Sequence, residues 1–261
     1  MSAPELVLAP SSWRQLGVRW AGLLTDHVLP GVAFALATIG NIYLLGEIRA
    51  GAGPAAGLDA TAQAWLFAQR AIYTVFVGLI AILFVIRRRR MGGQVGLVSA
   101  LFGLVLHPQN PGLRREVRTR LLPAVVALLG TNAMALQAFF PVHDAALALT
   151  VPGVALGALG LLLAAASLAS LGRCFGIFPE VRGLVQHGPY RVVRHPLYLA
   201  EIVASAGGIL TALSPYSVVV FVVFVALQFK RATYEEQVLT GMFPNYREYA
   251  GRTWRLIPGV H

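Results

Sequence analysis

Long apolar segments alternate with short polar or basic segments along most of the chain. Six apolar segments stand out, at 29–46, 62–86, 121–140, 145–170, 197–213 and 215–229. A helix needs roughly 20 apolar residues to cross a bilayer, and the first four segments have about that length. The last two are shorter, and the pattern predicts a helical hairpin with its turn at Ser214–Pro215. The chain is therefore predicted to be an all-α polytopic membrane bundle of about six transmembrane helices.

A further apolar segment, 95–106, is too short to cross a membrane. It lies between the basic stretches "RRRR" (87–90) and "RREVRTR" (114–120), which should lie on the same side. We interpret it as a short re-entrant or interfacial segment. Arginines recur in every second connection, whereas "PVHD" (141–144) and "SPYS" (214–217) contain none. Because basic loops stay in the cytoplasm, both termini are predicted to be cytoplasmic.

The composition supports a membrane protein and argues against other classes. Of 261 residues, 57% are hydrophobic and 12% are charged, against about 25% charged in soluble domains. The net charge of +10 comes mainly from arginines beside apolar segments, which favours membrane orientation and lipid contact over nucleic-acid binding. Cys174 is the only cysteine and the histidines are scattered, so no metal site is predicted. The first twenty residues lack the pattern of a signal peptide.

Polar residues concentrate in two segments, 171–201 and 230–258. The predicted hairpin 197–229 joins them, so both should reach the same membrane face and form one pocket. In "GPYRVVRHPLYLAE" (188–201), Pro196 suits the first turn of a helix that starts near His195–Pro196. The helix N-terminus, with Arg191 and Arg194 beside it, favours an anion such as a carboxylate.

Spacing relates three further polar residues to this helix. Arg194, Tyr198 and Glu201 would share one face if the helix extended back to Arg194. Glu201 lies within or near the apolar hairpin, where it is either functional or the counter-ion of Arg194 or Arg173. These two interpretations of Glu201 remain equally open.

The second segment contains "YEEQVL", with adjacent Glu235 and Glu236 on a predicted helix. Adjacent helical residues point about 100° apart, so we expect different roles: one faces the pocket and the other pairs with Lys230 or Arg231. The aromatic and basic stretch "FPNYREYAGRTWRLIP" (243–258) suits a cap at the membrane interface. Carboxylates, a helix N-terminus and aromatic side chains together admit a zwitterionic ligand with an aromatic group, such as S-adenosylmethionine, without singling it out.

The two motifs "HGPYRVVRHPLYLAE" and "YEEQVLTGMFPNYREY" resemble the paired motif of the integral-membrane methyltransferases. This superfamily includes isoprenylcysteine carboxyl methyltransferase and phosphatidylethanolamine N-methyltransferase, and the resemblance covers about 171–258. Two positions depart from the pattern: Ala200 and Pro244 stand where the family has glycine. The resemblance divides the chain into N-terminal helices of unassigned role (1–170) and a methyltransferase-like region (171–261).

The resemblance implies a site for S-adenosylmethionine and an acceptor that enters from the bilayer. The implied cofactor-binding residues are His187, Gly188, Tyr190, Arg194, His195, Pro196, Tyr198, Glu235 and Glu236. Arg194 would orient a carboxylate acceptor, whereas Glu201 or a pocket glutamate such as Glu236 would take the proton of an amine. A carboxylate, an amine and a thiol all remain possible acceptors.

Two other functions remain open from the sequence. A membrane sterol-type reductase would share a similar C-terminal architecture and use NADPH, and Arg247, Arg252 and Arg255 could bind its 2′-phosphate. A non-catalytic lipid-binding protein could also retain the pocket. Single residues within the apolar segments have simpler interpretations: Gly153, Gly157 and Gly160 suit close helix packing, while Gln69, Arg70, Asn132 and Gln137 suit contacts between helices more often than acceptor binding.

Overall fold

The computed structural model describes residues 28–57, 59–87, 97–106, 108–133, 147–177, 182–211 and 213–259. Within these ranges every regular element is a helix, and an isolated β-bridge pairs Val193 with Trp254. The prediction of an all-α fold is therefore confirmed for the described residues.

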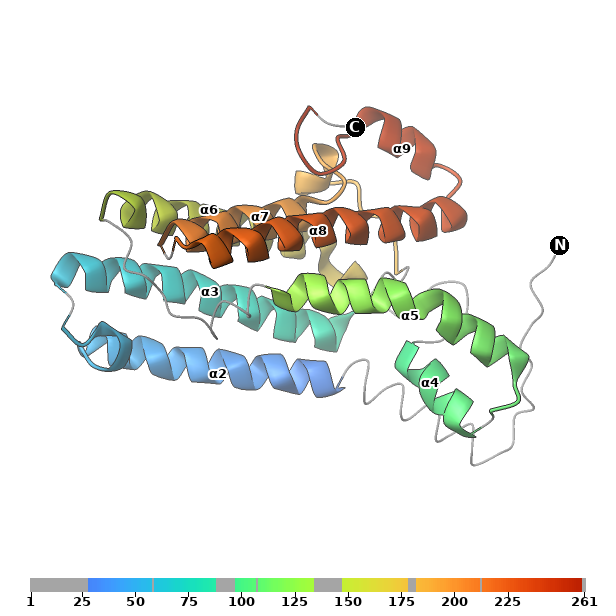
Figure 1. Ribbon diagram of the computed structural model, residues 1–261, viewed down its shortest axis with the longest axis horizontal. Coiled ribbons are helices and arrows are strands. Elements are labelled where there is room, and N and C mark those ends of the chain that lie inside the picture. Colours follow the sequence, from blue (N-terminus) through green and yellow to red (C-terminus); the bar gives the residue numbers. More distant parts are fainter. Residues whose placement is uncertain are drawn as a thin grey trace.

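Two groups of helices make up the bundle (Figure 1). Helices α2 (Leu29–Arg49) and α3 (Ala60–Ile86) form an antiparallel pair, connected through the short η2 (Gly53–Ala55). Against α3 packs the second group, which contains α6 (Leu147–Leu171), α7 (Pro196–Thr211) and α8 (Pro215–Met242).

Four helical stretches among the described residues are long and apolar enough to cross a membrane: Leu29–Arg49, Leu66–Ile86, Leu149–Cys174 and Pro215–Met242. Helix α7 is apolar but shorter. The expected segment 121–140 belongs in part to α5 (Pro111–Asn132), and its remainder lies outside the described residues, as does Gln137. These helices have the length and composition of a multi-pass membrane protein.

Helix α5 begins ten residues before the apolar segment that was predicted. The side chain of Asn110 caps it by accepting hydrogen bonds from the backbone N–H groups of Gly112 and Leu113, at 3.0 and 3.2 Å, and Pro111 occupies the first turn. The basic stretch 114–120 is therefore helical. The expected segment 95–106 is also helical, as α4 (Leu97–Leu106), and it packs against α5.

Close packing of α6 on α7 depends on glycine. A Cβ atom on Gly207 would lie 2.3 Å from the backbone nitrogen of Gly157 and 2.4 Å from the carbonyl oxygen of Gly153. A Cβ on Gly160 would meet the backbone of Ala204 at 2.2 Å. The packing interpretation of these α6 glycines is confirmed, and the helix they approach is α7.

The turn of the hairpin lies where the sequence indicates. Ser214 and Ser217 form a reciprocal capping box at the start of α8, and Pro215 follows the cap. The helix then runs on to Met242, well beyond the expected end at 229. Polar residues 230–242 contain no proline, so the helix continues to the turn at Phe243, where the exposed Pro244 follows. Part of the second polar segment is therefore an extension of α8.

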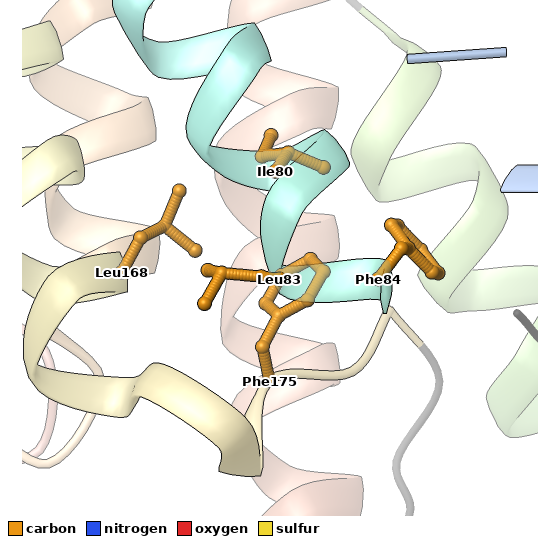
Figure 2. Close-up of a cluster of buried hydrophobic side chains, with 5 residues drawn as sticks. All are labelled: Ile80, Leu83, Phe84, Leu168 and Phe175. Carbon is orange, nitrogen blue, oxygen red and sulfur yellow. The ribbon is translucent and has the colours of Figure 1, made fainter. Parts of the chain in front are cut away.

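A compact aromatic and aliphatic cluster joins α3 to α6 (Figure 2). Ile80, Leu83 and Phe84 of α3 pack against Leu168 of α6 and against Phe175, which follows the short η4 (Gly172–Cys174). The Phe84 ring meets that of Phe175 edge-on at 5.4 Å between centroids. This cluster lies beside the site described next.

Candidate active site

The two polar segments meet at the N-terminus of α7, as predicted. The segment before α7 contains η5 (Gly188–Arg191), and the segment after α9 (Tyr246–Arg252) runs alongside it. The N–H groups of Arg194 and His195 donate to the carbonyls of Trp254 and Arg255, at 2.8 and 3.1 Å. This backbone pairing holds the C-terminal segment against the start of α7.

His195 lies between the two adjacent glutamates of α8. Its Nδ1 is 3.4 Å from Glu235 Oε2, and its Nε2 is 3.2 Å from Glu236 Oε1. Burial lowers the pKa of His195, but the hydrogen bonds and negative charges of Glu235 and Glu236 outweigh it, so the pKa is raised above its ordinary value. The site therefore favours an imidazolium that bridges two carboxylates.

Tyr198 extends this cluster towards Glu201. Its ring stacks on His195 with centroids 5.5 Å apart, and its hydroxyl donates to Glu235. The guanidinium of Arg231 lies 4.4 Å from the centroid of the Tyr198 ring, a cation–π contact. Tyr198 therefore contacts an acidic and a basic group of α8 at once.

Glu201 is paired with a residue of α8. Its Oε2 accepts from Gln228 Nε2 at 2.7 Å and lies 3.3 Å from Arg231 Nη1. The sequence suggested Arg194 or Arg173 as its counter-ion, and the ion pair is instead with Arg231. The hairpin explains the difference, because it places α7 directly beside α8.

Arg194 and Glu236 hold the C-terminal segment in place. Arg194 Nε donates to Glu236 Oε1 at 2.9 Å, and Arg194 Nη1 donates to the carbonyls of Ala250 and Thr253. Arg255 Nε lies 3.2 Å from Glu236 Oε2. Helix α7 begins only at Pro196, so Arg194 does not share a helical face with Tyr198 and Glu201. The expected pairing of a glutamate with Lys230 or Arg231 is wrong, because Glu236 pairs with Arg194 and Arg255 and Arg231 pairs with Glu201.

A pocket opens beside this cluster and has a polar and an apolar half. The predicted site residues that line it are Tyr190, Arg194, His195, Tyr198, Glu201 and Glu235. Its apolar lining includes Phe34, Phe76, Ile80, Leu168, Leu171, Phe175, Ile177, Leu184, Val185, Leu197, Val238 and Leu239. One continuous space therefore joins the charged groups to the apolar interior.

Four predicted site residues lie away from the pocket lining. His187 and Gly188 are exposed, Pro196 is buried in the first turn of α7, and Glu236 lies on the Arg194 side of His195. Gly188 has a φ of +59°, and a Cβ there would lie 2.4 Å from Ser170 Oγ. Its role in the structure is to shape the chain before α7.

Several lining residues were not identified from the sequence as site residues. Arg231 was considered only as a partner for a glutamate, and Tyr246 and Tyr249 only as parts of a cap. Tyr249 donates to the carbonyl of Tyr190 at 2.8 Å, and burial raises its pKa to about 12. The buried Tyr246 hydroxyl has no hydrogen-bond partner among the described residues. The three-residue spacing of the tyrosines in "YREY", which puts both on one face of a short helix, was the available signal.

Residues 148–246 match the family model described as phospholipid methyltransferase. The chain is also 35% identical over 109 residues to the protein-S-isoprenylcysteine O-methyltransferase A of Arabidopsis thaliana. That match covers 39% of this chain and 55% of the relative, so the chain spans about half the length of the curated relative it matches.

The matched region is similar to the integral-membrane methyltransferases. The resemblance seen in the paired motifs is therefore confirmed. The methyltransferase match includes α6, α7, α8 and the first residue of α9, and with them most of the charged pocket residues. Helices α2 and α3, which supply Phe34, Phe76 and Ile80 to the apolar half, lie outside it.

Proposed function

We propose that this protein transfers a methyl group from S-adenosylmethionine to a lipophilic acceptor. The observation that carries the proposal is the pocket itself: a charged, hydrogen-bonding half within the methyltransferase match continues into an apolar half between membrane-length helices. A polar donor and an apolar acceptor can approach each other only where two such environments adjoin.

The residues present fit this donor. S-adenosylmethionine has an ammonium group and ribose hydroxyls that donate hydrogen bonds, a carboxylate that accepts them, and a methyl group on a positively charged sulfur. Glu235 and Glu201 line the pocket as carboxylate acceptors. The Tyr246 hydroxyl is a buried donor that no described residue satisfies, and such groups nearly always have a partner. We therefore assign S-adenosylmethionine, the methyl donor, to the polar half of the pocket.

Alignment and exclusion of water are the contributions of the chain to catalysis. Arg194, His195 and Glu236 hold the start of α7, the C-terminal segment and α8 together through direct contacts, so we assign them a positioning role. Among the described residues, Glu201 contacts Gln228 and Arg231 through Oε2, and we assign Oε1 the role of taking a proton from an amine acceptor. A carboxylate acceptor would need no such base.

A pocket for NADPH has less support in the structure. The arginines suggested for its 2′-phosphate lie elsewhere, because Arg247 and Arg252 are exposed on α9 and Arg255 is paired with Glu236. None of these three is among the residues that line the described pocket. The two arginines that line the pocket, Arg194 and Arg231, are already paired with Glu236 and Glu201. A non-catalytic lipid-binding protein would differ from the proposed enzyme by the absence of methyl turnover.

We also propose the topology that the sequence indicates: six spans, cytoplasmic termini and a pocket on the cytoplasmic face. The ends of α3 and α6 beside the pocket adjoin the basic residues Arg87 and Arg173, which favours that face. We further propose that residues 171–261 form the catalytic region and that residues 1–170 supply the other helices. The methyltransferase match starts at residue 148 and therefore includes α6 as well.

Calorimetric binding to the detergent-purified protein tests the proposal. S-adenosylhomocysteine should bind and NADPH should not. Glu235→Gln should weaken S-adenosylhomocysteine at least about tenfold, because a charged hydrogen-bond acceptor is lost. Glu248→Gln is the matched control, since this glutamate is exposed on α9, and should leave binding unchanged. Binding of NADPH alone, or of neither ligand, would refute the assignment.

A further inference from the structure

Helices outside the methyltransferase match contribute to the apolar half of the pocket. Phe34 comes from α2, and Phe76 and Ile80 come from α3. These helices pack on each other, and α3 also packs on α6. The N-terminal part of the chain therefore helps to shape the space beside the polar cluster.

A tightly packed cluster of buried side chains forms an apolar wall beside this space (Figure 2) and shares Ile80, Leu168 and Phe175 with the pocket lining. Leu83 and Phe84 are each 2% exposed, and Leu168 is fully buried. The ring of Phe34 stacks on that of Phe84 at 5.6 Å, and the guanidinium of Arg87 lies 4.7 Å from the Phe84 ring centroid. Cores packed in this way resist the insertion of extra carbon atoms.

The wall lies close to the polar cluster. Leu197 follows His195 by two residues and directly precedes Tyr198, and it packs against the buried cluster of Ile80, Phe84 and Leu168. Leu197, which also lines the pocket, therefore connects the polar residues to the apolar wall. An apolar group bonded near the reacting atom of an acceptor would enter this space.

We propose that α2 and α3 form an apolar subsite for the part of the acceptor next to its reacting atom. The apolar wall of this subsite selects acceptors with compact groups at that position. Phe76 and Ile80 are then specificity-determining residues. Branched or single-ring substituents fit, whereas larger fused rings meet the wall. This inference rests on the proposed methyl transfer, because it concerns the acceptor side of the same pocket.

The test compares two isoleucines of α3 that differ in their surroundings. Ile80 is 8% exposed and lines the pocket, whereas Ile82 is 57% exposed on the outer surface of the helix. Ile80→Ala enlarges the subsite and Ile82→Ala does not. Ile80→Val makes a smaller enlargement, and it serves if the alanine variant fails to fold.

The probes are cysteines whose sulfur carries a single prenyl unit (3-methylbut-2-enyl), a benzyl group or a naphthylmethyl group, and each has both a carboxylate and an amine. Two readouts are taken for each: incorporation of labelled methyl from S-adenosylmethionine, and the shift of the thermal midpoint on probe binding. The wild type and Ile82→Ala should favour the smaller probes. In Ile80→Ala, the rate with the naphthylmethyl probe, relative to the rate with the smaller probes, should rise at least about fivefold. The same ratio of apparent affinities, taken from the midpoint shifts, should rise by at least as much.

The outcomes separate this inference from the proposed function. An identical size preference in Ile80→Ala and Ile82→Ala, in both readouts, overturns the subsite. A size preference that Ile80→Ala alone changes in the midpoint readout supports the subsite even without turnover. Failure of S-adenosylhomocysteine to bind refutes the methyl-transfer proposal independently, and the inference then fails as a statement about an acceptor.

Discussion

At the level of single residues, His195 organises the site because its two ring nitrogens face two carboxylates. Glu235 and Glu236 point in different directions from α8, as adjacent helical residues must, yet both reach this imidazole from opposite edges. We expected the two glutamates to differ in role. They do differ in their other contacts: Glu235 lines the pocket and accepts from Tyr198, whereas Glu236 pairs with two arginines.

The raised pKa of His195 makes the stability of the protein depend on pH. Its contribution is fully present below the ordinary pKa of 6.5 and is lost as the pH rises through the higher pKa of the folded state. Thermal unfolding in detergent should therefore show falling stability on the alkaline side of that value. The His195→Gln variant should lack this component, and a wild-type pH profile in that variant would contradict the buried imidazolium.

Arg194 should matter more for holding the C-terminal segment than its neighbour Arg191. Arg194→Gln removes an ion pair and two hydrogen bonds to backbone carbonyls, and breaking a buried pair costs about 3 kcal/mol. Limited proteolysis should then cut residues 243–259 faster. Arg191→Gln, at an exposed position, is the control. Equal cleavage of both variants would argue against the role of Arg194 in holding the C-terminal segment.

At the level of elements, the position of the site depends on a short helix held between two longer ones. Helix α7 packs against α6 through glycines and against α8 through the hairpin. This arrangement fixes where its N-terminus, and therefore His195 and Tyr198, must lie. Ala200 is fully buried in α7, so the methyl group that replaces the family glycine is accommodated in the packed helix.

Two adjacent glycines of α7 provide a direct test of this packing. Gly207→Ala places a methyl group within 2.4 Å of two backbone atoms of α6, whereas Gly208→Ala meets nothing within 4 Å. The first change should lower the free energy of unfolding by roughly 1–3 kcal/mol, and the second should leave it unchanged or slightly raised. Thermal unfolding of the two variants in the same detergent measures the difference; equal midpoints would show that α6 and α7 are not in close contact.

Helix boundaries show which element-level features a sequence can reveal. The turn at Ser214–Pro215 and the start of α7 at Pro196 were predictable because proline and capping residues mark them locally. The end of α8 was missed because a change from apolar to polar residues was taken as the end of a helix. Polarity changes the environment of a helix, but only a breaker or a cap ends it.

At the level of the whole molecule, the convergence of the two polar segments was predictable and the apolar wall was not. The convergence of the two polar segments could be predicted because a single short hairpin joins them and both motifs are recognisable in the sequence. Phe34, Phe76 and Ile80 are ordinary apolar residues of membrane-length helices, and nothing in their spacing separates pocket-lining from lipid-facing positions. The pairing of Glu201 with Arg231 was missed for a related reason, since long-range side-chain contacts depend on how α7 and α8 are rotated against each other.

The measurement that tests the account most directly is transfer of labelled methyl from S-adenosylmethionine into membrane lipids and S-isoprenyl cysteine by the purified protein. The account predicts label in a lipophilic product with the wild type and with Glu248→Gln, and at least about tenfold less with Glu235→Gln. Absence of label in any lipophilic acceptor, from protein that binds S-adenosylhomocysteine, would contradict the proposed enzyme. Equal labelling by Glu235→Gln would instead contradict the assignment of this pocket as the active site.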